Sequence, residues 1–153
     1  MKRGIWKLAF WAYLLFLFLV VILKFNGSFQ DLLERTQAEP YGKTYNLQPF
    51  TTLKLQLRHL SEGWAKFNLL GNTLPFIPFG FLLPLSCKRK SSLLGVLLWG
   101  QLFVLFAESV QLYTNLGTFD VDDIILNMTA IFLGYLPVGI FGMFRKIKRK
   151  NKK

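Results

Sequence analysis

The sequence has few of the residues that soluble enzymes use for their chemistry. Its single cysteine, Cys87, excludes a disulfide within the chain. Its single histidine, His59, leaves no serine–histidine, cysteine–histidine or thiolate-rich spacing, so we expect no nucleophilic or zinc chemistry and no cofactor. Acidic residues are also scarce, with eight Asp and Glu against nineteen Lys and Arg. Where these few acids lie is therefore informative.

Apolar residues are abundant instead. Of the 153 residues 52% are hydrophobic, and sixteen are phenylalanine, which is typical of a small helical membrane protein with one domain. The net charge of +11 does not indicate nucleic-acid binding, because the basic residues lie in blocks at the ends of apolar runs. We expect the lipid bilayer, and not nucleic acid, as the partner; the oligomeric state stays open.

Four apolar runs are long enough to cross a bilayer, which takes about 17 to 25 helical residues. They cover residues 8–25, 67–86, 92–112 and 124–144. The first run has no small-x-small cleavage pattern after it, so we expect a retained anchor and not a cleaved signal. The sequence predicts an all-α integral membrane protein with four transmembrane helices, as one domain over residues 1–153 with a basic tail at 145–153.

The segment between the first two runs is polar but keeps leucines at intervals. Ser28 and Asp31 predict a short capped helix that ends before Pro40. Residues 52–58 alternate like a strand, but a strand without a partner is unstable. Helical spacing instead puts four apolar residues on one stripe: Leu53, Leu57, Leu60 and Trp64. We therefore expect an external amphipathic helix on the membrane surface.

Proline and glycine mark two of the runs. Pro75 and Pro78 each lack an amide hydrogen, so the second run should be kinked or partly unwound and should face the bundle interior there. In the fourth run, Gly134, Gly139 and Gly142 should allow close helix contact. Pro137 should bend that run. Ser91 and Ser92 can cap the third run.

A polar stretch separates the third run from the fourth. Glu108 and Gln111 lie three residues apart, and Asp123 and Asn127 lie four apart, so each pair shares a helical face. Polar groups at membrane depth are costly and are normally kept for an interior site or a specific pairing. The sequence predicts a ligand-binding site of six residues: Asn68, Asn72, Glu108, Gln111, Asp123 and Asn127.

Simpler roles exist for part of this set. Asp120 and Asp122 precede the fourth run, where carboxylates cap a helix, so both are predicted structural caps. The amides are explained equally well as hydrogen bonds between helices. Glu108 needs a cation, a proton or a partner such as Arg58, and we favour a functional role for it. A weaker alternative has Asp120, Asp122, Asp123 and Glu108 binding a divalent metal ion.

The basic residues predict the orientation. With the amino terminus inside, thirteen of the nineteen bases lie on the cytoplasmic side, and every acid lies outside or near the outer end of its helix. We expect a multi-pass protein of the cell membrane with both termini cytoplasmic. The polar site then faces outward.

Five segments follow one another between roughly residues 46 and 135 and together form a recognisable pattern. They are Asn46-Leu-Gln-Pro-Phe50, Asn68-Leu-Leu-Gly-Asn72 running into Phe76-Ile-Pro-Phe-Gly-Phe-Leu-Leu-Pro84, Glu108-Ser-Val-Gln111, Phe119-Asp-Val-Asp-Asp-Ile-Ile-Leu-Asn127 and Gly134-Tyr135. Together they resemble the VanZ family of bacterial membrane proteins. Ala130 stands where that family often has glycine. The resemblance implies a cell-envelope protein and a link to resistance against the glycopeptide teicoplanin, but no particular reaction.

Three classes of function fit these features. The first is a non-enzymatic protein whose polar site binds a lipid-linked envelope intermediate, such as a cell-wall precursor, or an amphiphilic glycopeptide, with the kinked second run as one wall. The second is a metal-dependent membrane enzyme acting on a pyrophosphate-linked lipid or a phospholipid. The third is a small oligomeric transporter, although the sequence has no inverted repeat. We favour the first, and so lean against an enzyme.

Overall fold

The structure is a computed structural model that describes residues 2–23, 45–87, 92–114 and 117–150. In chain order the elements are α1 (Lys2–Leu23), β1 (Tyr45–Asn46), α3 (Thr51–Arg58), α4 (Gly63–Thr73), the 3-10 turn η1 (Leu74–Phe76), α5 (Ile77–Ser86), α6 (Leu93–Tyr113), β2 (Phe119–Asp120) and α7 (Val121–Lys150). The short helix expected from Ser28 lies outside the described residues.

Among the described residues, three helical stretches are long and apolar enough to cross a membrane, and they cover Gly63–Ser86, Leu93–Tyr113 and Val121–Phe144. A shorter apolar helix, Gly4–Val20, lies within α1. Large apolar side chains are exposed on these helices, as at Trp11 and Leu94. Exposed apolar surface of this extent is expected where lipid replaces water. The fold is that of an all-α, multi-pass membrane protein.

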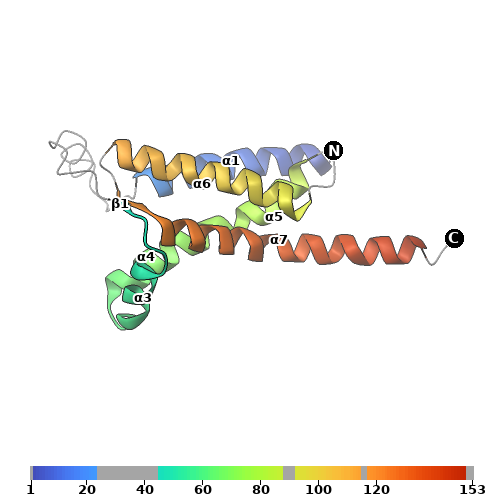
Figure 1. Ribbon diagram of the computed structural model, residues 1–153. Helices are drawn as coiled ribbons and strands as arrows, with labels where there is room; N and C mark the ends of the chain where they lie inside the picture. The colour runs from blue at the N-terminus through green and yellow to red at the C-terminus, as the bar shows by residue number, and fades with distance from the viewer. Residues whose placement is uncertain (1, 24–44, 88–91, 115–116, 151–153) are drawn as a thin grey trace.

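The helices form a bundle whose two ends differ. α5 packs against α1 and α7, and α6 packs against α7. Figure 1 shows that α6 and α7 run in opposite directions and that the start of α1 and the end of α7 lie at the same end of the molecule. β1 lies at the opposite end, and the last turns of α7 extend beyond the other helices.

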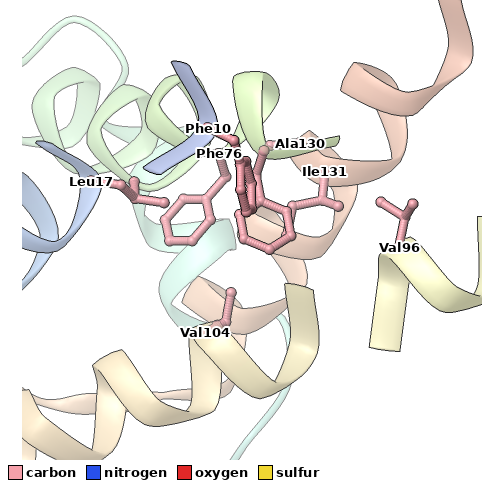
Figure 2. Close-up of a cluster of buried hydrophobic side chains, with 8 residues drawn as sticks. Phe10, Leu17, Phe76, Val96, Val104, Ala130 and Ile131 are labelled. Atoms are coloured by element: carbon pink, nitrogen blue, oxygen red, sulfur yellow. The ribbon is translucent and has the colours of Figure 1, made fainter. Parts of the chain in front are cut away.

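The core is apolar and takes side chains from α1, η1, α5, α6 and α7. Its eight buried members are Phe10, Leu17, Phe76, Phe79, Val96, Val104, Ala130 and Ile131. Figure 2 shows side chains of α1, η1, α6 and α7 pointing toward one another in this cluster. Burial of these side chains holds α1, α5, α6 and α7 together.

Glycines bring α5 and α7 into direct backbone contact. A Cβ atom placed on Gly134 would lie 1.9 Å from the carbonyl oxygen of Ile77, and one placed on Gly80 would lie 1.9 Å from that of Ile131. The two contacts are reciprocal, because each helix supplies one glycine and one carbonyl. The close contact predicted at Gly134 is therefore confirmed, and its counterpart Gly80 was not singled out from the sequence.

The other two predicted glycine contacts are wrong. The three atoms nearest to a Cβ on Gly139 all belong to the Tyr135 ring of its own helix, and Gly142 has nothing within 4 Å. A third close approach lies between α6 and α7, where a Cβ on Gly100 would be 2.6 Å from Cδ1 of Ile131.

The second apolar run is broken, as its prolines predict. α4 ends at Thr73, a 3-10 turn follows, and α5 begins at Ile77. The hydroxyl of Tyr13 in α1 donates a hydrogen bond of 2.6 Å to the carbonyl oxygen of Pro75. The break thus faces the bundle interior, where Phe76 is only 1% exposed, and a carbonyl within it has a partner from another helix.

α3 is a helix, which confirms the choice against a strand. It ends at Arg58, however, and a turn precedes α4, so the expected apolar stripe is divided between two helices. The buried residue of α3 is Gln56, at 2% exposed, whereas Leu57 and Trp64 are exposed. A short strand does form just before α3: β1 pairs in parallel with β2.

One predicted helix end is confirmed and others differ. Ser92 caps α6 by accepting the backbone N–H of Gly95 at 3.1 Å, as predicted. The second helical stretch begins at Gly63, four residues before the predicted start. α7 begins at Val121 and continues to Lys150, so most of the predicted basic tail prolongs this helix.

Candidate functional site

Four buried polar side chains lie at the end of the bundle that carries β1 and β2. We call them the polar layer: Glu108 (3% exposed), Gln111 (1%), Asp123 (6%) and Asn127 (2%). α6 and α7 are antiparallel neighbours, and Glu108 is about 7.5 Å along the axis from the end of α6, while Asn127 is about 9 Å from the start of α7. The two pairs therefore lie at a similar depth.

The polar layer directly adjoins the apolar core. Val104 lies four residues before Glu108 in α6, and Ile131 lies four residues after Asn127 in α7. Both apolar residues are 0% exposed. A step of four residues is about one helical turn, so each helix changes from buried apolar to buried polar within one turn. The polar layer closes one end of the core.

Asp120 fixes the start of α7 and the segment before α3. One carboxylate oxygen accepts the backbone N–H of Asp122 at 2.8 Å, which is the N-cap hydrogen bond of α7. The other accepts the hydroxyl of Thr52 at 2.6 Å, and the amide of Asn46 lies 3.4 Å from the first oxygen. Asn46 and Asp120 also pair in the β1–β2 ladder. Asp120 therefore joins α7 to the chain around residues 46–52.

Asp122 caps a helix other than its own. Its carboxylate accepts the backbone N–H of Phe50 at 2.5 Å and that of Leu53 at 2.9 Å, at the start of α3. Unpaired N–H groups and the positive end of the helix dipole meet there, so a carboxylate is favourable. Phe50 has a φ of 65°, unusual for a residue other than glycine. We call Asp120 and Asp122 the carboxylate clamp.

Only part of the predicted six-residue site is buried. Asn68 is exposed and Asn72 is half-buried, so Asn68 does not lie in the buried polar layer. The reason is that a shared helical face does not specify whether that face points inward. Glu108, Gln111, Asp123 and Asn127 are buried as expected, and Asp120 and Asp122 make capping hydrogen bonds.

Three further polar residues were not identified from the sequence: Asn46, Thr52 and Gln56. Gln56 is 2% exposed, and its side-chain oxygen has no hydrogen-bond partner in the described part of the chain. The same holds for the side-chain oxygen of Asn127. Gln56 lies between the apolar residues Leu55 and Leu57, so the pattern of apolar residues predicts that the leucines, and not Gln56, are buried. The only sequence signal for Asn46 was its place in the Asn46–Phe50 segment of the VanZ resemblance.

The arrangement of the described acids bears on the metal-binding alternative. In the described part of the chain, no group of three or more His, Cys, Asp or Glu side chains is arranged to hold a metal ion. The quartet considered from the sequence, Asp120, Asp122, Asp123 and Glu108, is not found as such a group among these residues. The clamp carboxylates already accept backbone and hydroxyl hydrogen bonds.

Comparison with known proteins places the chain in a family. No curated protein and no solved structure is detectably similar to this chain. The family profile described as VanZ/LLP1 matches residues 10–142. This range includes the carboxylate clamp, the polar layer and the broken second run, and it confirms the resemblance found in the sequence. The chain therefore belongs to the VanZ/LLP1 family.

Proposed function

We propose that the polar layer is an outward-facing site that binds a lipid-linked envelope intermediate or an amphiphilic glycopeptide, and that binding contributes to teicoplanin-type resistance. The observation that carries this proposal is the burial of four polar side chains, each at most 6% exposed, at one end of an apolar bundle. Hydrogen bonds between membrane helices contribute only about 1 to 2 kcal/mol or less, whereas buried carboxylates are costly. Buried carboxylates that cost more stability than their hydrogen bonds return are therefore best explained by a function.

The same proposal assigns four spans, with both termini cytoplasmic and α3 outside. α1 has 22 residues, about 33 Å of helix, and its apolar part Gly4–Val20 covers about 26 Å, which is the lower limit for spanning a hydrocarbon core of about 30 Å. The start of α1 and the end of α7 lie at one end of the bundle, as an even number of spans requires. The excess of bases at that end favours the cytoplasmic side.

Cysteine labelling of intact cells tests this orientation. In a Cys87→Ser background, single cysteines replace Glu62 and Lys148, which are both exposed. A membrane-impermeant maleimide should label the Glu62→Cys protein from outside and should label the Lys148→Cys protein only after permeabilisation. The opposite pattern would invert the orientation and place the polar layer at the cytoplasmic face.

Binding itself is tested with purified protein in nanodiscs. A fluorescent teicoplanin-type glycopeptide and a lipid-linked disaccharide precursor are titrated against loaded and empty discs. We expect saturable binding of at least one of them to the loaded discs only, unchanged by EDTA because no metal-ligand group is arranged among the described residues. If neither probe binds saturably, the proposed function is wrong.

The two other classes of function have weaker support. A metal-dependent enzyme would need a ligand set that the described acids do not form. A transporter is suggested by the broken second run, but that break packs into the apolar core through Phe76 and Phe79. Loss of binding on addition of EDTA would favour the enzyme, and counterflow of a probe in vesicles would favour the transporter.

A further inference from the structure

Two buried side-chain oxygens have no hydrogen-bond donor among the residues that the structure describes. They are Oδ1 of Asn127 and Oε1 of Gln56, and each side chain is 2% exposed. Both are carboxamide oxygens, so both accept hydrogen bonds. Buried polar groups in folded proteins nearly always have a partner, because a buried acceptor without one is costly. The two oxygens therefore indicate a bound group that donates hydrogen bonds.

These oxygens belong to elements that the carboxylate clamp joins. Asn127 lies one turn after Asp123 on α7, so the two share a face. Gln56 follows Thr52 by four residues, and the side-chain hydroxyl of Thr52 donates a hydrogen bond to Asp120 of the clamp at the start of α7. Gln56 therefore lies on the face of α3 that is directed toward α7. Both acceptors lie near the first turns of α7.

The charge of the buried polar side chains limits the ligand. Among the described residues they include the carboxylates of Glu108 and Asp123 and no lysine or arginine. Glu108, Gln111 and Asp123 each interact with other groups of the protein, so their contribution to a ligand is the negative field of the acids. This field disfavours a phosphate group. A hydroxyl group would supply a donor but would not complement the charge.

We infer that Asn127 and Gln56, together with the polar layer, recognise a protonated primary amine on the ligand. An ammonium group supplies up to three N–H donors and the positive charge that the carboxylates favour. This inference rests on the proposed function and narrows it to ligands that carry such an amine.

Three probes with the same alkyl chain separate the chemistry: dodecylammonium, dodecyltrimethylammonium and dodecyl phosphate. Each is titrated calorimetrically into protein in zwitterionic nanodiscs, with the heats of empty discs subtracted. Dodecylammonium should bind at least about tenfold more tightly than the trimethyl probe, which keeps the charge but has no N–H donors. Dodecyl phosphate should show no saturable binding.

Variants assign the donor contact to Asn127. Asn127→Leu should weaken dodecylammonium binding by about tenfold and leave the trimethyl probe unchanged. Because the change removes an unpartnered buried oxygen, thermal stability should be equal or higher. The matched control is Thr129→Val, an exposed position on the same helix, which should alter neither affinity.

The outcomes distinguish this inference from the proposed function. Equal affinity for the two ammonium probes, tighter binding of the phosphate probe, or full dodecylammonium affinity in Asn127→Leu would each overturn the amine inference. If the glycopeptide or the lipid-linked precursor still bound saturably, the proposed function would stand without it. If neither of those bound, the proposed function would fail by its own test.

Discussion

Replacing Gly134 with alanine is expected to separate α5 from α7 and to lower the free energy of unfolding by about 3 kcal/mol or more. The added Cβ would lie 1.9 Å from the carbonyl oxygen of Ile77, and a backbone atom cannot move aside as a flexible side chain can. Unfolding in a mixed detergent titration, followed by circular dichroism, measures the change.

Gly142→Ala is the matched control for this prediction. It makes the same chemical change on the same helix, at a position with nothing within 4 Å, so stability should be unchanged or slightly raised by the better helix propensity of alanine. Equal unfolding midpoints for the Gly134→Ala and Gly142→Ala proteins would contradict the close contact between α5 and α7.

Much of the helical architecture could be predicted from local sequence rules. Each of the predicted apolar runs contains a helical stretch. The length of an apolar run is enough to predict this, because a segment that crosses a bilayer as a helix needs about 20 apolar residues. The break around Pro75 and Pro78 was predictable because a missing amide hydrogen is a property of the residue. The cap at Ser92 was predictable for the same kind of reason.

Features that depend on how helices are rotated could not be predicted. Spacing places Asn68 and Asn72 on one face, but only packing decides that Asn68 is exposed. Gly134 contacts another helix and Gly142 does not, although both lie on one helix and are glycine. Local rules assigned Asp122 to its own helix, whereas its partners are the amides of Phe50 and Leu53, about seventy residues earlier.

The second large effect is expected at Glu108. Glu108→Gln keeps the shape of the side chain and most of its hydrogen-bonding capacity, while it removes the carboxylate. If Glu108 only joined helices, the change should be neutral or even stabilising. We predict instead an intact fold and a loss of ligand affinity of about tenfold or more, since hydrogen bonds to charged groups are worth about 1.5 to 3 kcal/mol. Asp123→Asn should behave alike.

Asp120→Asn provides a contrast within the same cluster. Its carboxylate caps α7 and accepts the hydroxyl of Thr52, so this variant should chiefly lower stability, by about 1 kcal/mol. Ser109→Ala, at the exposed residue next to Glu108, should change neither stability nor affinity.

The most direct test of the binding-site interpretation is the affinity of Glu108→Gln for the fluorescent glycopeptide and the lipid-linked precursor, measured beside its unfolding midpoint in the same nanodiscs. The account predicts a wild-type midpoint with binding weakened at least about tenfold. Wild-type affinity at a wild-type midpoint would contradict it, and the polar layer would then be structural packing between helices.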